Sequence, residues 1–367
     1  MIKKIITLFI AFTLFICQNV SYADTLSLSA SSYVLIDEIS GRVLLEKNAH
    51  NKMAMASTTK IMTALIALEN SNLDDQVIVD ERSTGVEGSS IYLKNEEVIS
   101  MKDLLYGLML RSGNDSAVAI ANYISGDEEQ FINLMNEKAK SIGALNTNFT
   151  NPHGLSHNDH YSTAYDLSLI TREAFKFDVF KDIVSAKSYN ADRDANGYFL
   201  NKNQTLWDYP GGDGVKIGYT MAAGRCLVSS AMRDGMRLIA VSLQAPNWFN
   251  DNYKIMDHGF ENYRPYTIYN KNQLMKKIQI TKDNINLNLV AENDLIYPLK
   301  DDEMNSIKVN VTVNNHIDLP INKGEILGSI DTYSNGVLIK KDNLVSSHDI
   351  KEKSLIDRFI DFLRPSS

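Results

Sequence analysis

Cysteine is nearly absent from this chain of 367 residues, which contains only Cys17 and Cys226. Cys17 lies in a segment that we expect to be removed on export, so Cys226 would have no partner for an intrachain disulfide. The residues that follow Cys226, Leu227 and Val228, are typical of a strand. The sequence therefore predicts a buried thiol whose role is packing.

Basic clusters are also missing. The chain has 45 acidic against 37 basic residues and a formal net charge of −8. Nucleic-acid-binding proteins gather Lys and Arg on one face, so the composition gives no support for a nucleic-acid partner. Internal repeats and low-complexity segments are absent too, while the length and the 44% of apolar residues allow more than one folded domain.

One long apolar run occurs, at the N-terminus. Two lysines precede the stretch from Ile5 to Cys17, and Ser21–Ala23 contains the small residues of a cleavage site. This pattern predicts a secretory signal peptide at 1–23; an uncleaved anchor helix is the alternative. The protein is therefore expected outside the cytoplasm.

A serine and a lysine three residues apart open an apolar helical segment. Ser57 and Lys60 are followed by apolar residues at helical spacing, from Ile61 to Leu68. Positions i and i+3 share one helix face, so the Ser57 hydroxyl and the Lys60 amine can meet. A neutral lysine amine is a base, and burial or a nearby cation favours the neutral form. The pair thus predicts a serine nucleophile activated without histidine.

Two later clusters complete this motif. Ser112-Gly113-Asn114 interrupts a helical pattern over 102–123, so that Ser112 and Asn114 would project from a tight turn. Lys216-Ile217-Gly218 precedes strand-like residues and would supply a second cation. The expected roles are Lys60 as general base, Ser112 as proton relay to the leaving amine, Asn114 as partner of the substrate amide, Lys216 as binder of a substrate carboxylate, and the N–H groups of Ser57 and Tyr219 as oxyanion hole.

The remaining pattern predicts two domains and a terminal helix. Strands at 33–37, 43–45, 227–231 and 238–243, with helices at 128–142 and 164–176 among them, indicate a mixed catalytic domain over 24–264. Alternating apolar residues and turn signals then predict a small all-β domain over 265–345. Residues 346–367 carry an apolar stripe between charges, which predicts an amphipathic helix that lies on a membrane surface or packs on its own domain.

With these motifs the chain resembles the low-molecular-weight penicillin-binding proteins that act as serine D-alanyl-D-alanine carboxypeptidases. The resemblance covers the whole mature chain and includes these further segments: Pro152–Leu155, His160–Ser162, Asn201–Asn203, Leu206–Asp208, Ala222–Gly224 and Leu319–Gly324. It implies an α+β fold, with a penicillin-recognition domain of antiparallel sheet and helices followed by a β domain. It also implies removal of the terminal D-alanine from peptidoglycan stem peptides, acylation by β-lactams at Ser57, a membrane-bound terminal helix and no cofactor.

The resemblance implies substrate binding by Asn114, Lys216, Gly218, Tyr219 and Thr220, and it shows one departure. The family has threonine between the lysine and glycine of the third motif, and this chain has Ile217. Isoleucine keeps the β-branched shape but cannot hydrogen-bond a carboxylate. Losing one hydrogen bond to a charged group costs about 1.5–3 kcal/mol, so a weakened activity is expected, with Thr220 compensating only in part.

Three alternatives remain at this stage. A β-lactamase would need a carboxylate that positions the deacylating water, and no convincing candidate is present. A metal hydrolase would use His153, His157 and His160, but these lie on a loop without a helical His-Glu-x-x-His frame. A catalytically degenerate wall-binding protein is favoured by Ile217 alone.

Overall fold

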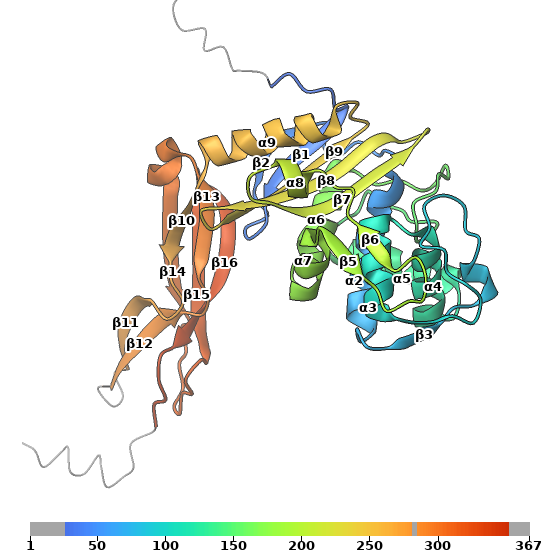
Figure 1. Cartoon of the computed structure of the whole chain (residues 1–367). Coiled ribbons are helices and arrows are strands. Elements are labelled where there is room, and N and C mark those ends of the chain that lie inside the picture. The colour runs from blue at the N-terminus through green and yellow to red at the C-terminus, as the bar shows by residue number, and fades with distance from the viewer. Residues whose placement is uncertain (1–25, 281–284, 352–367) are drawn as a thin grey trace, which may run out of the picture.

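The computed structural model describes residues 26–280 and 285–351. The predicted signal peptide at 1–23 and residues 352–367 of the predicted terminal helix lie outside them. Figure 1 shows two parts, a larger one of helices around a sheet and an elongated one of strands. The fold is therefore α+β, as the sequence predicted.

The larger part is built on a five-stranded antiparallel sheet in the order β2-β1-β9-β8-β7, so that β7 is an edge strand. The turn between β8 and β9 is at Asp234 and Gly235, both with positive φ, which confirms the hairpin that this dipeptide predicts. The strands are β1 (Ser32–Asp37), β2 (Val43–Lys47), β7 (Gly212–Thr220), β8 (Gly224–Arg233) and β9 (Met236–Leu243).

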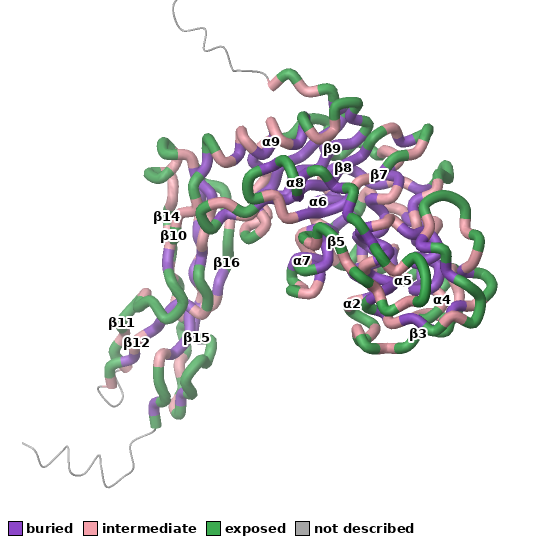
Figure 2. The backbone as a smooth tube through the Cα atoms, viewed as in Figure 1, coloured by how far each residue is buried: buried purple, intermediate pink, exposed green. Residues whose placement is uncertain are grey.

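Helices cover both faces of this sheet because its central strands alternate between two apolar cores. Val34 and Ile36 of β1 face the core that contains α2 and α6, whereas Leu35 faces the core beneath α9. Figure 2 shows the buried strands between these layers. The helices are α2 (Lys60–Asn70), α3 (Met101–Tyr106), α4 (Asn114–Ser125), α5 (Glu128–Ser141), α6 (Ala164–Ala174), α7 (Asp178–Ser185), α8 (Thr205–Asp208) and α9 (Trp248–Asn262).

Shorter elements complete this part and carry the residues around the site. A 3₁₀ turn, η1 (Ala56–Thr59), precedes α2, and a π-helical turn, η3 (Gly107–Arg111), follows α3. The others are β3 (Gln76–Ile78), η2 (Glu81–Ser83), β4 (Val98–Ser100), β5 (Ser188–Asn190) and β6 (Tyr198–Leu200). Cys226 on β8 is fully buried, as predicted, and burial raises the pKa of its thiol to about 11.

The second part is all β and begins with β10, next to the predicted boundary at residue 265. Its five-stranded sheet has the order β11-β12-β16-β15-β14, and β10 pairs with β13. A bridge from Ile321 to Ile350 lies beyond residue 345, the predicted end of this domain. The elements are β10 (Arg264–Tyr269), β11 (Leu274–Ile280), β12 (Ile285–Ala291), β13 (Leu295–Leu299), η4 (Asp301–Ser306), β14 (Ile307–Val313), β15 (Ile326–Ser334) and β16 (Val337–Ser346).

An arginine joins the two parts. Arg42, just before β2, makes a bidentate ion pair with Glu303 of η4, at 2.6 and 2.9 Å, and its guanidinium lies over the rings of Tyr263 and Tyr297. Within the described ranges, no helix has the length and apolarity that crossing a bilayer requires.

Candidate active site

The three sequence motifs meet at one pocket of about 220 Å³ between η1, η3 and β7. Of the predicted site residues, five line it: Ser57, Ser112, Lys216, Gly218 and Tyr219. Lys60 lies behind Ser57, whereas Asn114 and Thr220 are outside the pocket lining and bind other groups. The predicted convergence of the three motifs is therefore present in the structure.

Ser57 and Lys60 adopt the expected pairing across one helical turn. Ser57 is in η1 and Lys60 begins α2, and the Lys60 amine lies 3.1 Å from the Ser57 Oγ. The lysine side chain has no exposed surface, while Ser57 is half-buried at the pocket. Ser57 is therefore accessible from the pocket, whereas its base, Lys60, is shielded from solvent.

The other two partners of the Lys60 amine are oxygens that can only accept. Its Nζ lies 2.6 Å from Asn114 Oδ1 and 2.6 Å from the His153 carbonyl. Asn114 is oriented this way because its Nδ2 donates to the Glu87 carbonyl. A neutral amine would donate its two hydrogens to these oxygens and keep its lone pair for the Ser57 hydroxyl. The geometry therefore suits a base.

The electrostatics of the two lysines favour the same protonation state. Burial, and secondarily the charge of Lys216, hold the pKa of Lys60 well below its ordinary value. Burial and the nearby charge of Lys202 lower the pKa of Lys216 to about 7. The surroundings of Lys60 thus favour its neutral form, and Lys216, with a pKa of about 7, is partly charged at neutral pH until an anion binds and raises its pKa.

Close approach of β7 to η1 requires a residue without a side chain at 218. A Cβ on Gly218 would lie 2.9 Å from the Ser57 nitrogen and 3.1 Å from the Thr58 nitrogen. Both are backbone atoms, which cannot rotate away. Gly218 therefore allows the strand that carries Lys216 to lie against the nucleophile.

Two residues of the site have left-handed backbones that favour glycine, although neither is glycine. Ala56, which precedes Ser57, has φ 49°, and Ser112 has φ 61°. Ser112 stands between η3 and α4, at the interruption that the sequence predicted. Such conformations are costly and persist where surrounding contacts hold them, and they commonly mark functional sites.

The third motif differs from the expectation at Thr220. Its Oγ1 accepts hydrogen bonds from Ser156 Oγ, at 3.1 Å, and from the Ala223 N–H, at 3.0 Å. Both bonds use Thr220 as the acceptor and tie it to the turn between β7 and β8, outside the pocket lining. Ile217 itself lines the pocket and is half-buried.

Two of the three loop histidines, His153 and His160, support the base and the turn that carries the nucleophile. Besides the His153 carbonyl on Lys60, His160 Nε2 lies 2.8 Å from Thr59 Oγ1, and its Nδ1 accepts from the Thr150 N–H. Burial lowers the pKa of His153 to about 3 and that of His160 to about 4. Their side chains are neutral at physiological pH and belong to the packing behind the site.

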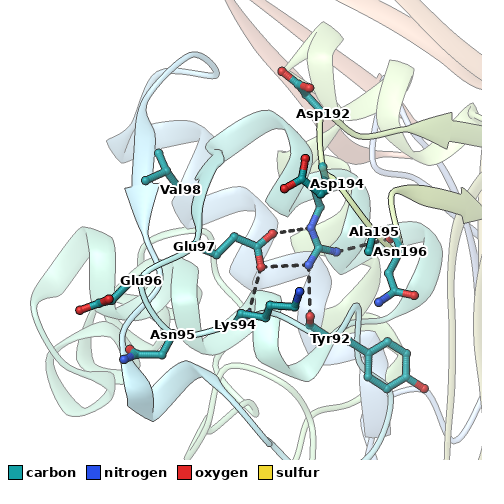
Figure 3. Close-up of a pocket in the computed structure, with 11 residues that line it drawn as sticks. Tyr92, Lys94, Asn95, Glu96, Glu97, Val98, Asp192, Asp194, Ala195 and Asn196 are labelled. Carbon is teal, nitrogen blue, oxygen red and sulfur yellow. Dashed lines mark hydrogen bonds and ion pairs between the residues drawn. The ribbon is translucent and has the colours of Figure 1, made fainter.

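Outside this pocket, a second and more polar pocket of about 440 Å³ surrounds Arg193. The Arg193 guanidinium binds both carboxylate oxygens of Glu97 and the carbonyls of Ile91 and Tyr92. In Figure 3 dashed lines join the guanidinium to the Glu97 carboxylate and to the backbone carbonyl of Tyr92, whose ring points away. Arg193 thereby holds the loop that contains Ser89, and the Ser89 carbonyl accepts a hydrogen bond from the Asn114 N–H.

Sequence reasoning missed several of these contacts. The carbonyls of His153 and Glu87 have no side-chain signal, because any residue supplies a backbone carbonyl. Arg193 is nearly a hundred residues from Glu97 in the sequence, so only the fold pairs them. In the sequence, only the family resemblance points to the segment Pro152–Leu155, which contains the His153 carbonyl.

Comparison with known proteins agrees with the geometry. Residues 18–247 match the D-alanyl-D-alanine carboxypeptidase family model, and residues 263–352 match the C-terminal domain of penicillin-binding protein 5. The chain is 34% identical to D-alanyl-D-alanine carboxypeptidase DacF of Bacillus subtilis over 95% of this chain and 91% of the relative. It is 32% identical to DacC of Escherichia coli over 92% and 88%.

A solved structure extends the likeness to the whole fold. Penicillin-binding protein 5 of Haemophilus influenzae superposes with a TM-score of 0.75 at 29% identity, and the match covers 89% of this chain and 98% of that one. The family model alone covers more than half of the chain. The chain therefore belongs to the D-alanyl-D-alanine carboxypeptidase family and is a serine-type carboxypeptidase.

Proposed function

We propose that the protein removes the terminal D-alanine of peptidoglycan stem pentapeptides through an acyl-enzyme on Ser57. The observation that carries this proposal is the Lys60 amine at 3.1 Å from Ser57 Oγ, with its other two neighbours restricted to accepting. In the first step the Ser57 oxygen attacks the carbonyl carbon between the two D-alanines, and Lys60 takes the hydroxyl proton. The N–H groups of Ser57 and Tyr219 would stabilise the oxyanion.

Ser112 completes the proton path. Its side chain lines the pocket beside the nucleophile, on a turn that is fixed by η3 and α4. We assign it the transfer of a proton to the nitrogen of the departing D-alanine. A water molecule then attacks the acyl-enzyme, again with Lys60 as base, and releases the shortened peptide. Asn114 acts in this scheme by orienting Lys60 through its Oδ1.

Lys216 would bind the terminal carboxylate of the substrate, and Gly218 keeps its strand close to Ser57. The Ile217 side chain adds no hydrogen bond, and Thr220 lies outside the pocket lining. One hydrogen bond to a charged group is worth about 1.5–3 kcal/mol, which is about 10- to 150-fold in rate. We therefore propose a working but weakened carboxypeptidase.

The proposal includes β-lactam binding and location. β-Lactams would acylate the same Ser57, because their strained amide would occupy the position of the scissile bond. The signal sequence predicted at 1–23 and the terminal segment 346–367 support an exported protein at the outer face of the membrane. Residues 24–264 would be the catalytic domain and 265–345 a spacer domain.

The direct test measures D-alanine release from a peptide that ends in D-Ala-D-Ala, with the unmodified protein, Ile217→Thr and Ser57→Ala in parallel. We expect slow release by the first, faster release by the second and none by the third. Ser57→Ala should also abolish covalent penicillin labelling, and persistent labelling would overturn the assignment of the nucleophile.

A degenerate penicillin-binding protein is the second candidate, and Ile217 is the observation in its favour. It would be labelled by penicillin but release no D-alanine. A β-lactamase is less well supported, because the lining contributed by the described residues contains no Asp or Glu. Slow turnover of the penicilloyl-enzyme would distinguish a carboxypeptidase from a β-lactamase.

A further inference from the structure

One arginine of the active-site pocket has no partner. Arg111 ends η3, immediately before Ser112, and lines the pocket. Within residues 26–280 and 285–351, every other arginine side chain makes a hydrogen bond or an ion pair. Arg111 makes neither, although it is half-buried. A guanidinium with five free donors is suited to binding an anion, and Arg111 shares this pocket with Ser57.

A second cation of the same pocket is in a similar position. Lys202 follows β6 and lines the pocket, and its exposed amine has no hydrogen-bond or ion-pair partner in the part of the chain that the structure describes. It is near enough to Lys216 to act on the charge of that amine. Because β6 packs on η3, Arg111 and Lys202 belong to adjoining elements.

Three cations therefore border one pocket whose described lining contains no carboxylate. The terminal carboxylate of the substrate can neutralise only one of them, and that one is Lys216 in the proposed function. When substrate excludes water from the pocket, the remaining positive charges are costly unless another anion faces them. A second carboxylate on the substrate would meet this requirement.

The chemistry of the substrate limits where that carboxylate can be. Both residues of the D-Ala-D-Ala pair carry methyl side chains. The nearest side chain that can be anionic belongs to the residue before the pair, which is about 3.5 Å of extended chain away from it. Only a long side chain at this position would extend from the scissile bond to Arg111 and Lys202.

We propose that Arg111 and Lys202 form an anionic subsite, which selects peptides with a free side-chain carboxylate on the residue before D-Ala-D-Ala. The inference rests on the proposed function and specifies its substrate class. Peptides with a neutral, amidated or cationic group at this position are poorer substrates. Charge-assisted hydrogen bonds at a partly exposed site should give a preference of about tenfold.

The test uses three acetylated peptides that differ only in the side chain before D-Ala-D-Ala: L-α-aminoadipyl, with a carboxylate, L-norleucyl, which is neutral, and L-lysyl. D-alanine release by the full chain gives kcat/KM for each. We expect the order aminoadipyl, norleucyl, lysyl, with a gap of about tenfold between the first two that narrows as salt is added. Equal kcat/KM values for the three peptides would overturn the subsite.

Variants connect the preference to the two residues. Arg111→Gln and Lys202→Gln should each reduce the ratio of aminoadipyl to norleucyl kcat/KM, and the double variant should bring it close to one. Lys187→Gln is the control, because Lys187 lies over the Trp207 ring, away from the pocket lining, and the ratio should not change. Damage to the fold would lower kcat/KM for all three peptides by the same factor and would not change the ratio. A ratio that stays unchanged in the double variant therefore contradicts the proposal.

The two proposals can fail separately. If the unmodified protein releases D-alanine from none of the three peptides, the proposed function fails, and equilibrium binding of the same peptides then tests the subsite. Tighter binding of the aminoadipyl peptide that is lost in the double variant supports it. Equal binding of the aminoadipyl and norleucyl peptides refutes it.

Discussion

The Lys60 amine and the Asn114 side-chain oxygen lie 2.6 Å apart, and the hydrogen bond that the Asn114 amide nitrogen donates to the Glu87 carbonyl fixes this orientation of the side chain. Asn114 thus keeps one hydrogen of Lys60 occupied. With the His153 carbonyl on the second hydrogen, the lone pair of a neutral amine is directed to Ser57. Together with the burial of Lys60, these contacts favour a neutral amine that can act as a base.

Asn114→Asp should slow acylation at neutral pH and move its pH dependence upward. A carboxylate at this position would favour the charged form of Lys60 and raise its pKa by at least about one unit. Below the raised pKa, each pH unit lowers the fraction of neutral amine, and with it the acylation rate, about tenfold. Stopped-flow measurement of penicillin acylation between pH 6 and 10 checks this. A variant that is slow at every pH would show that the effect is steric rather than electrostatic.

Stability should increase with pH in the range where Lys216 titrates. In the unfolded chain a lysine holds its proton up to about pH 10.4, but folded Lys216 loses its proton near pH 7. Above that pH the unfolded state binds more protons, so the free energy of unfolding rises by about 1.4 kcal/mol per pH unit.

The measurement is urea unfolding of the unmodified protein and of Lys216→Met between pH 7 and 8.5. In the methionine variant the free energy of unfolding should rise less steeply with pH, because residue 216 no longer titrates. This variant should also be the more stable protein at pH 7. Parallel stability curves for the two proteins would show that Lys216 keeps an ordinary pKa.

Gly218→Ala should damage the site more than the fold. The added methyl would press on the backbone nitrogens of Ser57 and Thr58, so that either β7 or η1 must shift. Overpacking of this kind costs about 1–3 kcal/mol of stability. Acylation should fall by more than tenfold, because both the oxyanion site and Lys216 move with the strand. Thermal unfolding and penicillin acylation, measured on the same preparation, separate the two effects.

Arg193→Ala should destabilise the protein, because it leaves Glu97 without its partner and the carbonyls of Ile91, Tyr92 and Asn196 without this donor. The Arg193 side chain is only 3% exposed, and breaking a buried ion pair costs about 3–5 kcal/mol; the partly exposed Glu97 places this pair near the lower limit. Glu97→Gln keeps one acceptor and should cost less. Urea unfolding of the two variants gives the comparison, and an equal loss would argue against a role for the ion pair.

Local sequence patterns predicted the elements that carry the motifs. Ser57 and Lys60 meet because helical spacing dictates it, and Gly113 ends one helix before Asn114 begins the next. The hairpin at Asp234 and Gly235 follows from the φ angles that these residues tolerate. Such features depend on a few neighbouring residues and can be read without the fold.

Other parts of the structure depend on contacts between distant segments. The helix α9 has no simple apolar stripe, because its buried face includes Asp251, Asn252 and Gly259. The orientation of Asn114, which is expected to bind substrate, depends on the Glu87 carbonyl, which lies 27 residues away in the sequence. Thr220 was expected at the pocket, and its turn directs it to Ser156. No local pattern contains this information.

The edge position of β7 has a consequence for evolution of the substrate range. An edge strand offers its free N–H and C=O groups to any extended peptide, whatever the side chains of that peptide. Backbone pairing along β7 would therefore contribute affinity without discrimination. Mutations in the pocket lining outside β7, which includes Arg111 and Lys202, could then change which peptides are cleaved while the catalytic residues stay untouched.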